Sequence, residues 1–484
     1  GVGGAVMSAP SNLAVRVADR LSELPGPWDV FAERSRRFEI HLSATRVELT
    51  RGPMVLEGYG LRLLRAIDGQ TGVGYQASTD FSDEGVRAAV KDAEKYARFN
   101  QFPAKHPELP GGRPPTGDGP KIVDPALWSD PSGALERFAA ALLAAFEGRK
   151  GAVPSFSSVK ATLTEASVAN SAGLAHSYAH TAVETEIAVK AFGGPEGRPP
   201  GEYWFSDLGR RLDPDPLPTL AIEWSRFAED ARRATSPPNG DFPVVLPPDV
   251  LTGIIPAVAR FQFGAAARLR GLGVVAESQV GGDGLDVADD GLLDWGIGSS
   301  PIDDEGTPQR KRKIISNGRV GEILFDVLHA DALGSTSTGN GSRAGGIDPS
   351  VGLWRRFTRR PAPEASTIVI PAGNGGTDAE VIEQVEDGIW VQQLAWAQPD
   401  ELGGRFGGEI RIGYRIHHGK LAEPVRGGTV GGAVVARDGA PSLLRDLLAV
   451  GSKPKLMGAL SSPTLLIRSL SVSGDGHATP ATAP

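Results

Sequence analysis

The sequence predicts an α+β fold, and three observations support this prediction. Asp-Gly, Asn-Gly and His-Gly dipeptides stand between apolar runs, as in tight β-hairpins. Elsewhere, apolar residues recur with helical spacing. The 63 Gly and 38 Pro residues indicate many turns and short elements. Because 484 residues exceed what one hydrophobic core usually serves, we expect two large domains.

Three hairpins are predicted from their turns. They turn at Asp68-Gly69, at Asn317-Gly318 and near His418-Gly419, where the residue types accept the positive φ of two-residue connections. In the last hairpin, isoleucine and tyrosine alternate with arginine and glycine over 410–416. This period of two predicts a strand with one buried face.

Three helices are predicted from caps and apolar stripes. Ser82 caps a segment that runs to about Phe99, with acidic residues in its first turn. An apolar stripe over Leu135–Phe146 predicts a second helix. Thr377 and Glu380 form a capping box for a third helix, which we expect to end by Gly388.

Two Pro- and Gly-rich stretches suggest the domain organisation. The segment HPELPGGRPPTGDGP, between residues 99 and 125, is typical of a linker or a long surface loop. The segment ATSPPNGD precedes the apolar strand FPVVL, and there we place the main boundary. We expect an N-terminal mixed α/β domain over 1–238, with a subdivision near 100–125 left open, a C-terminal domain over 239–474, and a disordered tail over 475–484.

Composition excludes several functional classes. The net charge of −8 argues against direct nucleic-acid binding, so we interpret the basic runs Arg34–Arg37, 309–313, 355–356 and 359–360 as solvated surface. The absence of cysteine excludes disulfides and thiolate ligands and fits a reducing compartment. No apolar run approaches the ~18 residues of a membrane span, and the start of the chain lacks a secretory signal. We expect a cytoplasmic protein that does not contact membranes.

Four segments, in order along the chain, carry a family resemblance. They are VANSAGL (168–174), SPIDDEGTPQRKRKIISNGRVGEILFDVLHADALGSTSTGNGSR (300–343), EPVRGGTVGGAVV (423–435) and the closing PTLLIRSLSVSG. Together they resemble the TldD/PmbA family of peptidase subunits, and the likeness extends from Val47 to Gly474. The resemblance implies that a curved antiparallel sheet dominates the C-terminal domain.

The chemistry of the active family branch is missing from this chain. TldD-type subunits carry a His-Glu-x-x-x-His helix and a C-terminal cysteine, which together hold a metal and activate its water. The corresponding stretch here, Leu251–Gly264, contains neither His nor Glu. The resemblance is therefore to the metal-free PmbA/TldE branch, with no catalytic or metal-binding residue and no cofactor in this chain.

That branch implies a partner and a substrate class. The partner is a TldD-type metallopeptidase subunit that holds a metal ion, zinc, and the two chains enclose a cavity. An unfolded peptide enters as an added β-strand, a mode in which main-chain hydrogen bonds supply affinity. The implied roles are maturation of natural-product peptides by removal of leader peptides and degradation of unfolded peptides. A non-catalytic homodimer that binds peptides or regulates another protein stays open as an alternative.

A second alternative is an independent hydrolase with a metal site at His176, His180 and Glu184. On a helix the two imidazoles could chelate one ion. The β-branched composition of SYAHTAVETEIAVKAF favours a strand instead, where they would lie ~13 Å apart. We therefore interpret them as surface or interface histidines.

Two further segments are candidate sites. The acidic run Asp303, Asp304 and Glu305 could bind a hard cation, although an acidic turn is the preferred interpretation. The glycine-rich loop 335–343 lacks the lysine of a phosphate-binding loop. Its Thr338, Asn340 and Arg343 could contact main-chain carbonyls of a peptide, and substrate contact and a plain turn stay equally open.

Overall fold

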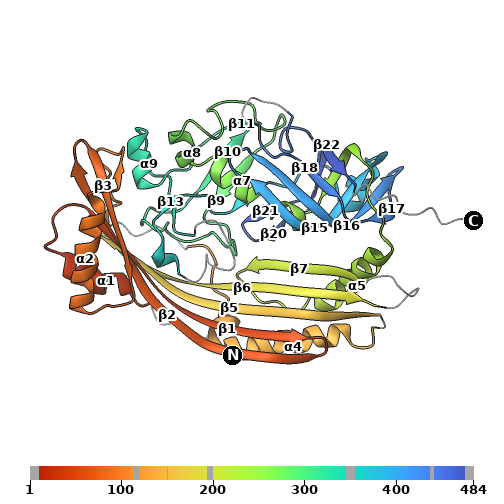
Figure 1. The fold of residues 1–484 in the computed structure, drawn as a ribbon, viewed down its shortest axis with the longest axis horizontal. Helices are drawn as coiled ribbons and strands as arrows, with labels where there is room; N and C mark the ends of the chain where they lie inside the picture. Colours follow the sequence, from red (N-terminus) through yellow and green to blue (C-terminus); the bar gives the residue numbers. More distant parts are fainter. Residues whose placement is uncertain are drawn as a thin grey trace, which may run out of the picture.

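A long, curved antiparallel sheet forms the N-terminal half of the computed structural model (Figure 1). The structure describes residues 10–112, 119–149, 151–192, 200–344, 355–436 and 441–474. Within these, seven strands follow the order β4-β3-β2-β1-β5-β6-β7. The strands are β1 (Trp28–Ser43), β2 (Arg46–Ile67), β3 (Gln70–Ser78), β4 (Gln101–Phe102), β5 (Ala152–Asn170), β6 (Ala175–Ala191) and β7 (Gly201–Gly209).

Helices cover parts of this sheet. They are α1 (Leu13–Ala18), α2 (Asp83–Ala97), α3 (Pro125–Ser129), α4 (Pro131–Phe146) and α5 (Leu217–Arg233), with a 3-10 turn over Asp19–Leu21. Phe138 and Leu142 of α4 and Trp224 of α5 share one buried cluster with Val183 and Ile187 of β6. The apolar residues of β6 therefore face the helices, and the residues between them are left for the opposite face.

The C-terminal half combines a small barrel with a second sheet. Strands β15, β8, β22, β18 and β16 pair in that order, and β15 also pairs with β16, which closes the ring. These strands are β8 (Gly240–Leu246), β15 (Asp387–Asp400), β16 (Arg405–His417), β18 (Thr429–Ala433) and β22 (Leu465–Ser473), flanked by β17 (Lys420–Val425) and β19 (Leu447–Val450). Most pairings are antiparallel, so the expected α+β fold with a curved C-terminal sheet is confirmed.

The second sheet has the order β11-β10-β9-β14-β21-β20. Its strands are β9 (Val287–Asp290), β10 (Lys311–Ser316), β11 (Arg319–Val320), β14 (Ile368–Val369), β20 (Lys455–Met457) and β21 (Leu460–Ser462). The remaining elements are α6 (Pro248–Leu251), α7 (Ile255–Gln262), α8 (Ala265–Leu269), α9 (Val327–Ala332), α10 (Asp378–Glu383), β12 (Gly341–Ser342), β13 (Ala362–Pro363) and a 3-10 turn over Arg356–Thr358.

The predicted hairpins and caps are confirmed. Asp68, Asn317 and His418 each have φ near +50°, and each is followed by a glycine with positive φ. Ser82 caps α2, and the capping box of Thr377 and Glu380 is present.

One predicted helix limit was wrong. Helix α4 begins earlier than expected, at Pro131, because Asp130 accepts a hydrogen bond from the Gly133 amide. Helix α10 ends at Glu383, before Gly388 as expected, and β15 begins at Asp387.

The stretch 99–125 does not divide the sheet, because strands on both sides of it belong to the same sheet. Its described residues pack on other parts of the chain: Ala104 is fully buried, and the Ile122 carbonyl accepts a hydrogen bond from the Thr181 amide. Near the second stretch, β8 begins at Gly240. The domain limits stay a prediction, and the expected tail 475–484 lies outside the described residues.

Buried ion pairs and a shared core join the two halves. Arg62 of β2 binds Asp29 of β1 at 2.6 Å and Glu305 of the C-terminal half at 2.7 Å. On α5, Asp230 accepts a hydrogen bond from the Tyr414 hydroxyl of β16 at 2.7 Å. These contacts fix the N-terminal sheet against the C-terminal half, and this relation positions the pocket described below.

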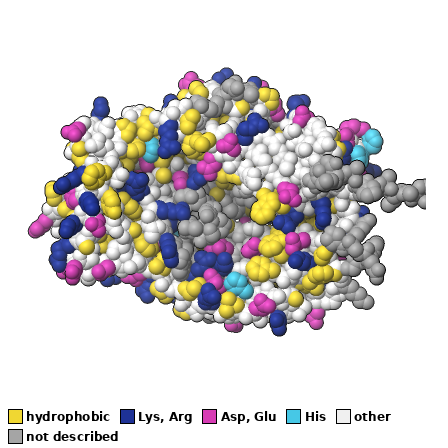
Figure 2. Space-filling view, viewed as in Figure 1, with side chains coloured by type: hydrophobic (Ala, Val, Ile, Leu, Met, Phe, Trp, Pro, Cys, Tyr) yellow, Lys and Arg dark blue, Asp and Glu magenta, His cyan; other side chains and the backbone are white. Residues whose placement is uncertain are grey.

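The described surface of the face in Figure 2 mixes acidic and basic side chains, and no extended basic patch is visible there. The expectation that the chain does not bind nucleic acid directly stays a prediction. In the described residues, no helix has both the length and the apolar character that a membrane crossing requires.

The interpretation of all the basic runs as solvated surface was wrong at three positions. Arg37, Arg312 and Arg356 are largely buried and paired with carboxylates of other elements, namely Glu184, Asp289 and Asp304.

Candidate functional site

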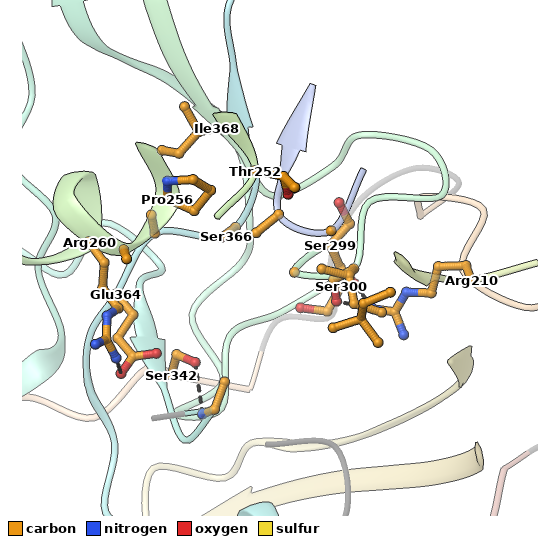
Figure 3. Close-up of a pocket in the computed structure, with 18 of the residues that line it drawn as sticks. Arg210, Thr252, Pro256, Arg260, Ser299, Ser300, Ser342, Glu364, Ser366 and Ile368 are labelled. Atoms are coloured by element: carbon orange, nitrogen blue, oxygen red, sulfur yellow. Dashed lines mark hydrogen bonds and ion pairs between the residues drawn. The ribbon is translucent and has the colours of Figure 1, made fainter. Parts of the chain in front are cut away.

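A pocket of 770 Å³ lies between the N-terminal sheet and the C-terminal half (Figure 3). Its N-terminal wall comes from β5, β6 and β7. Its C-terminal wall comes from α7, the loop 297–300, the acidic run 303–304 and the loop 340–344. The pocket is thus built by both halves of the chain.

Strand alternation places the side chains of the N-terminal wall. Tyr178, His180, Glu184 and Glu186 of β6 line the pocket, while the intervening Val183 belongs to the cluster under the helices. The same period puts Ser158 and Lys160 of β5 on the pocket side. The sheet therefore presents a polar and charged face to the cavity and an apolar face to the helices.

Helix α7 lines the opposite wall with side chains that cannot bind a metal. Pro256, Ala257 and Arg260 of this helix line the pocket, together with Thr252 and Gly253 just before it, and none offers an imidazole, carboxylate or thiolate. The Arg260 guanidinium instead pairs with Glu364 at 3.3 Å and Glu401 at 2.5 Å. The positive charge of Arg260 would repel a bound metal ion. The helix therefore does not fit the metal ion that TldD-type subunits bind at the corresponding helix.

Arg356 organises a buried polar corner of the pocket. Its guanidinium pairs with Asp304 at 3.2 Å and Glu33 at 3.4 Å, and it lies 3.3 Å from the Nε2 atom of His180. Burial, with smaller contributions from the Arg210 and Arg356 charges, holds the pKa of His180 well below its usual range. His180 is therefore neutral at physiological pH.

The metal site proposed for His176, His180 and Glu184 is not formed. The segment is the strand β6, as its composition favoured. His180 lies beside Arg356, and Glu184 pairs with Arg37 at 3.2 Å. Among the described residues, no three or more His, Cys, Asp or Glu side chains are placed to hold a metal ion.

The acidic run forms a buried turn whose carboxylates already have partners. Asp303 accepts hydrogen bonds from the Glu305, Thr307 and Gly341 amides at 2.8–3.0 Å. Asp304 pairs with Arg356, and Glu305 pairs with Arg62. Burial is the main cause that raises the pKa of Asp303 well above its usual range and the pKa of Glu305 to about 7. These contacts favour the structural interpretation over a cation site.

The glycine-rich loop gives its three candidate residues partners inside the protein. The Thr338 hydroxyl donates to Asn340 at 2.6 Å, and the Asn340 amide donates to Asp289 at 2.8 Å. Arg343 is fully buried and pairs with Asp29 at 3.1 Å. Asn340 lines the pocket, whereas Thr338 and Arg343 are not among its lining residues. Substrate contact stays a prediction, and these contacts favour a structural role for Arg343.

Sequence reasoning missed the arginines that define the pocket. Arg210 follows β7, Arg260 lies on α7, and Arg356 begins a 3-10 turn, so they are far apart in the sequence. The one available signal was the even-numbered polar residues of β6, which share a face of a strand. That signal marks a polar face but does not identify what lies opposite.

Two segments of the chain match a protein family. Residues 239–474 match the PmbA/TldA metallopeptidase C-terminal domain, and residues 28–97 match the PmbA/TldA metallopeptidase domain 1. Together the two matches cover more than half of the chain.

Curated relatives match over shorter segments. A metalloprotease TldD homologue of Buchnera aphidicola is 31% identical over 30% of this chain and 28% of its own length. A zinc metalloprotease TldD homologue of Saccharolobus solfataricus is 25% identical over 42% of this chain and 44% of its own length. The chain therefore matches less than half the length of these relatives.

Solved structures share the fold over nearly the whole chain. TldE from Thermococcus kodakarensis has a TM-score of 0.74 at 18% identity and covers 96% of this chain and 99% of its own. A Thermotoga maritima protein described as a candidate modulator of DNA gyrase has a TM-score of 0.76 at 17% identity, covering 95% and 99% of the two chains. With the family matches, these observations establish that the chain belongs to the TldD/PmbA family of metallopeptidase-type proteins.

Proposed function

We propose that this chain is a metal-free, TldE/PmbA-like subunit of a TldD/TldE-type metallopeptidase complex. The observation that carries the proposal is helix α7. In the family resemblance, this stretch corresponds to the metal-binding helix, yet here it presents Pro256, Ala257 and Arg260 to the pocket. Bond cleavage would then take place on a TldD-type partner, with zinc as its metal.

The chain's own contribution is to shape the cavity and hold the peptide. β7 is the last strand of its sheet and pairs only with β6 among the described strands. Ser206, Asp207 and Leu208 of β7 line the pocket. An extended peptide placed along this edge would gain main-chain hydrogen bonds without requiring a particular sequence. This arrangement suits unfolded peptides and the leader peptides of natural products.

The direct test is co-expression with a TldD-type chain that carries His-Glu-x-x-x-His. We expect the pair to co-purify, to contain about one zinc per partner chain, and to cleave a casein-derived unstructured peptide. Each chain alone should be inactive, and the pair should lose activity when the glutamate of the partner's motif is changed to glutamine. Zinc content and cleavage are measured by elemental analysis and mass spectrometry.

Two outcomes would replace the proposal. If the single chain binds zinc and cleaves the peptide as well as the pair does, it is an independent hydrolase. If light scattering shows a stable homodimer that does not bind the partner, the chain is a stand-alone peptide-binding or regulatory protein.

A fractionation experiment on the native host tests the expected cytoplasmic location separately.

A further inference from the structure

Arg210 is a buried cation whose partners are all neutral. Its guanidinium donates to the main-chain carbonyls of Gly296, Thr181, Ile297 and Ser299 at 3.2, 3.0, 2.6 and 3.0 Å. Among the described residues, no carboxylate lies within ion-pair distance of it. It nevertheless lines the pocket, where Figure 3 shows it extending toward Ser299 and Ser300.

The other fully buried arginines behave differently. Arg62 and Arg343 both pair with Asp29, and Arg312 pairs with Asp289 at 2.5 Å. A buried charge without a counter-charge is costly, which is why such groups normally have a partner of opposite sign. Arg210 therefore departs from the pattern that the rest of this interior follows.

The surroundings of Arg210 make its charged form less favourable, so a bound anion would stabilise it. Burial first, and then the nearby charge of Arg356, lower the pKa of Arg210 to about 9. The group is still a cation at neutral pH. The nearest carboxylates, Asp304 and Glu33, form ion pairs with Arg356 and not with Arg210. Among the described residues, Arg210 therefore has only neutral groups in direct contact, whereas both nearby carboxylates contact Arg356.

Two neutral groups near this corner are also without partners. The Nε2 atom of His180 faces a guanidinium, which can only donate, so the proton of the neutral ring lies on Nδ1. That Nδ1 atom and the Ser299 hydroxyl are buried and have no hydrogen-bond partner among the described residues. Both residues line the pocket. Each group carries a hydrogen that it can donate to a bound acceptor.

We propose that this corner binds the carboxylate of a peptide, with Arg210 supplying the charge and His180 and Ser299 the neighbouring donors. Arg210 contributes a single positive charge, which suits a monoanion better than a doubly charged phosphate. The carboxylate can come from the C-terminus of the peptide or from an Asp or Glu side chain. The proposal rests on the proposed peptide-holding role and adds what this subunit recognises.

The first experiment uses the unmodified full-length chain and three peptides. All carry fluorescein on the N-terminus of Gly-Ser-Ala-Val-Ala: one has a free C-terminal carboxylate, one a C-terminal amide, and one an amide after a final Glu in place of Ala. Binding is measured by fluorescence polarisation. We expect the free acid to bind at least about tenfold more tightly than the first amide, the effect of a charge-assisted hydrogen bond.

The third peptide distinguishes the two sources of the carboxylate. If it binds like the free acid, the corner accepts a side-chain carboxylate, and if it binds like the first amide, the corner requires the C-terminus. Equal binding of all three peptides overturns the proposal, and so does the absence of binding to any of them by the chain alone and by its complex. Cleavage of the acid and amide at equal rates by the complex would overturn this inference and leave the proposed function intact.

The second experiment changes the arginine. Arg210→Met removes the charge, and the ratio of acid to amide affinity should fall to about one, whereas Arg210→Lys should keep most of the ratio. Arg310→Met removes an exposed charge outside the pocket and should leave the ratio unchanged. Because the ratio compares two peptides on the same protein, partial loss of stability does not imitate the effect. If Arg210→Met does not fold, the Lys variant and the peptide series still decide.

Discussion

The N-terminal sheet and the C-terminal barrel enclose their cores in different ways. The sheet uses long strands, such as β1 with 16 residues and β2 with 22, whereas barrel strands β8 and β18 have 7 and 5. An open sheet has two faces, and only one of them is covered by helices here. The barrel strands instead bury apolar side chains on both faces, with Ile410 in one cluster and Ile412 in the cluster shared with the helices, and their half of the chain contributes to the pocket largely through α7 and loops.

This difference separates the chemistry of the two pocket walls. On β6 of the sheet, most pocket residues alternate along the strand, and they include His180, Glu184 and Glu186. On the C-terminal wall, they come from irregular segments whose carboxylates are held by main-chain amides and arginines, as Asp303 is. The two walls meet at buried ion pairs, and the variants below test how strongly they depend on each other.

The largest effect is expected from Arg62→Met. The substitution leaves Asp29 and Glu305 without their shared cation, and removal of one partner from a buried pair typically costs roughly 3–5 kcal/mol. Urea unfolding at pH 8 measures this loss. Arg310→Met breaks the exposed pair with Glu322 and should cost less than about 1 kcal/mol. Equal losses in the two variants would show that the buried pairs do not join the halves.

Next in size are core truncations in each half. Leu142→Ala under the sheet and Ile410→Ala in the barrel each remove a fully buried side chain, at a cost of roughly 2–5 kcal/mol. Because the cluster of Leu142 also contains Tyr414 and Ile416 of the barrel, we expect one unfolding transition that both variants shift. Calorimetry would contradict this with two transitions, each moved by only one variant. The exposed Ile222→Ala should change stability by less than about 0.5 kcal/mol.

A smaller effect concerns pH. Burial, partly offset by Arg62, raises the pKa of Glu305 to about 7 from its usual 4.5, so the folded state holds this proton more tightly than the unfolded chain. Its contribution to stability is complete below pH 4.5 and is lost as the pH rises to about 7, by roughly 1–3 kcal/mol.

Glu305→Gln should remove this loss. Urea unfolding measured at half-unit steps between pH 4.5 and 7.5 should give a flatter profile than the unmodified chain. The exposed Glu322→Gln should keep the original slope, since its pKa is lowered by Arg310 rather than raised. Identical profiles for the Glu305 variant and the unmodified chain would mean that Glu305 is already ionised in the folded protein.

The smallest effect is expected at a hairpin turn. His418 has φ of +50°, a value that Asn and Asp adopt more readily. His418→Asn should therefore stabilise the protein by about 0.3–1 kcal/mol, and the reverse change Asn317→His, at φ of +50°, should destabilise it by a similar amount. Thermal unfolding measures both. A shift of the two midpoints in the same direction would indicate that side-chain contacts, such as that of His418 with Glu386, outweigh backbone preference.

Local features were predictable because they depend on neighbouring residues. The turns at Asp68-Gly69 and Asn317-Gly318, the cap at Ser82 and the capping box at Thr377 use interactions within a few positions of the chain. The alternation that placed Glu184 and Glu186 against Val183 and Ile187 on β6 also follows from strand geometry alone. The absence of His and Glu from Leu251–Gly264 is likewise a property of the sequence.

The sequence by itself therefore determined the α+β class, three hairpin turns, two helix caps and the absence of His and Glu from Leu251–Gly264. Only the tertiary structure decided which charges are buried and what they face. Arg356 looked like solvated surface but meets Asp304 and Glu33. Arg210 gave no signal, yet it lines the pocket and contacts no carboxylate of the described residues. The physical reason is that the energy of a buried charge depends on groups within a few ångströms, and here those groups come from distant parts of the chain.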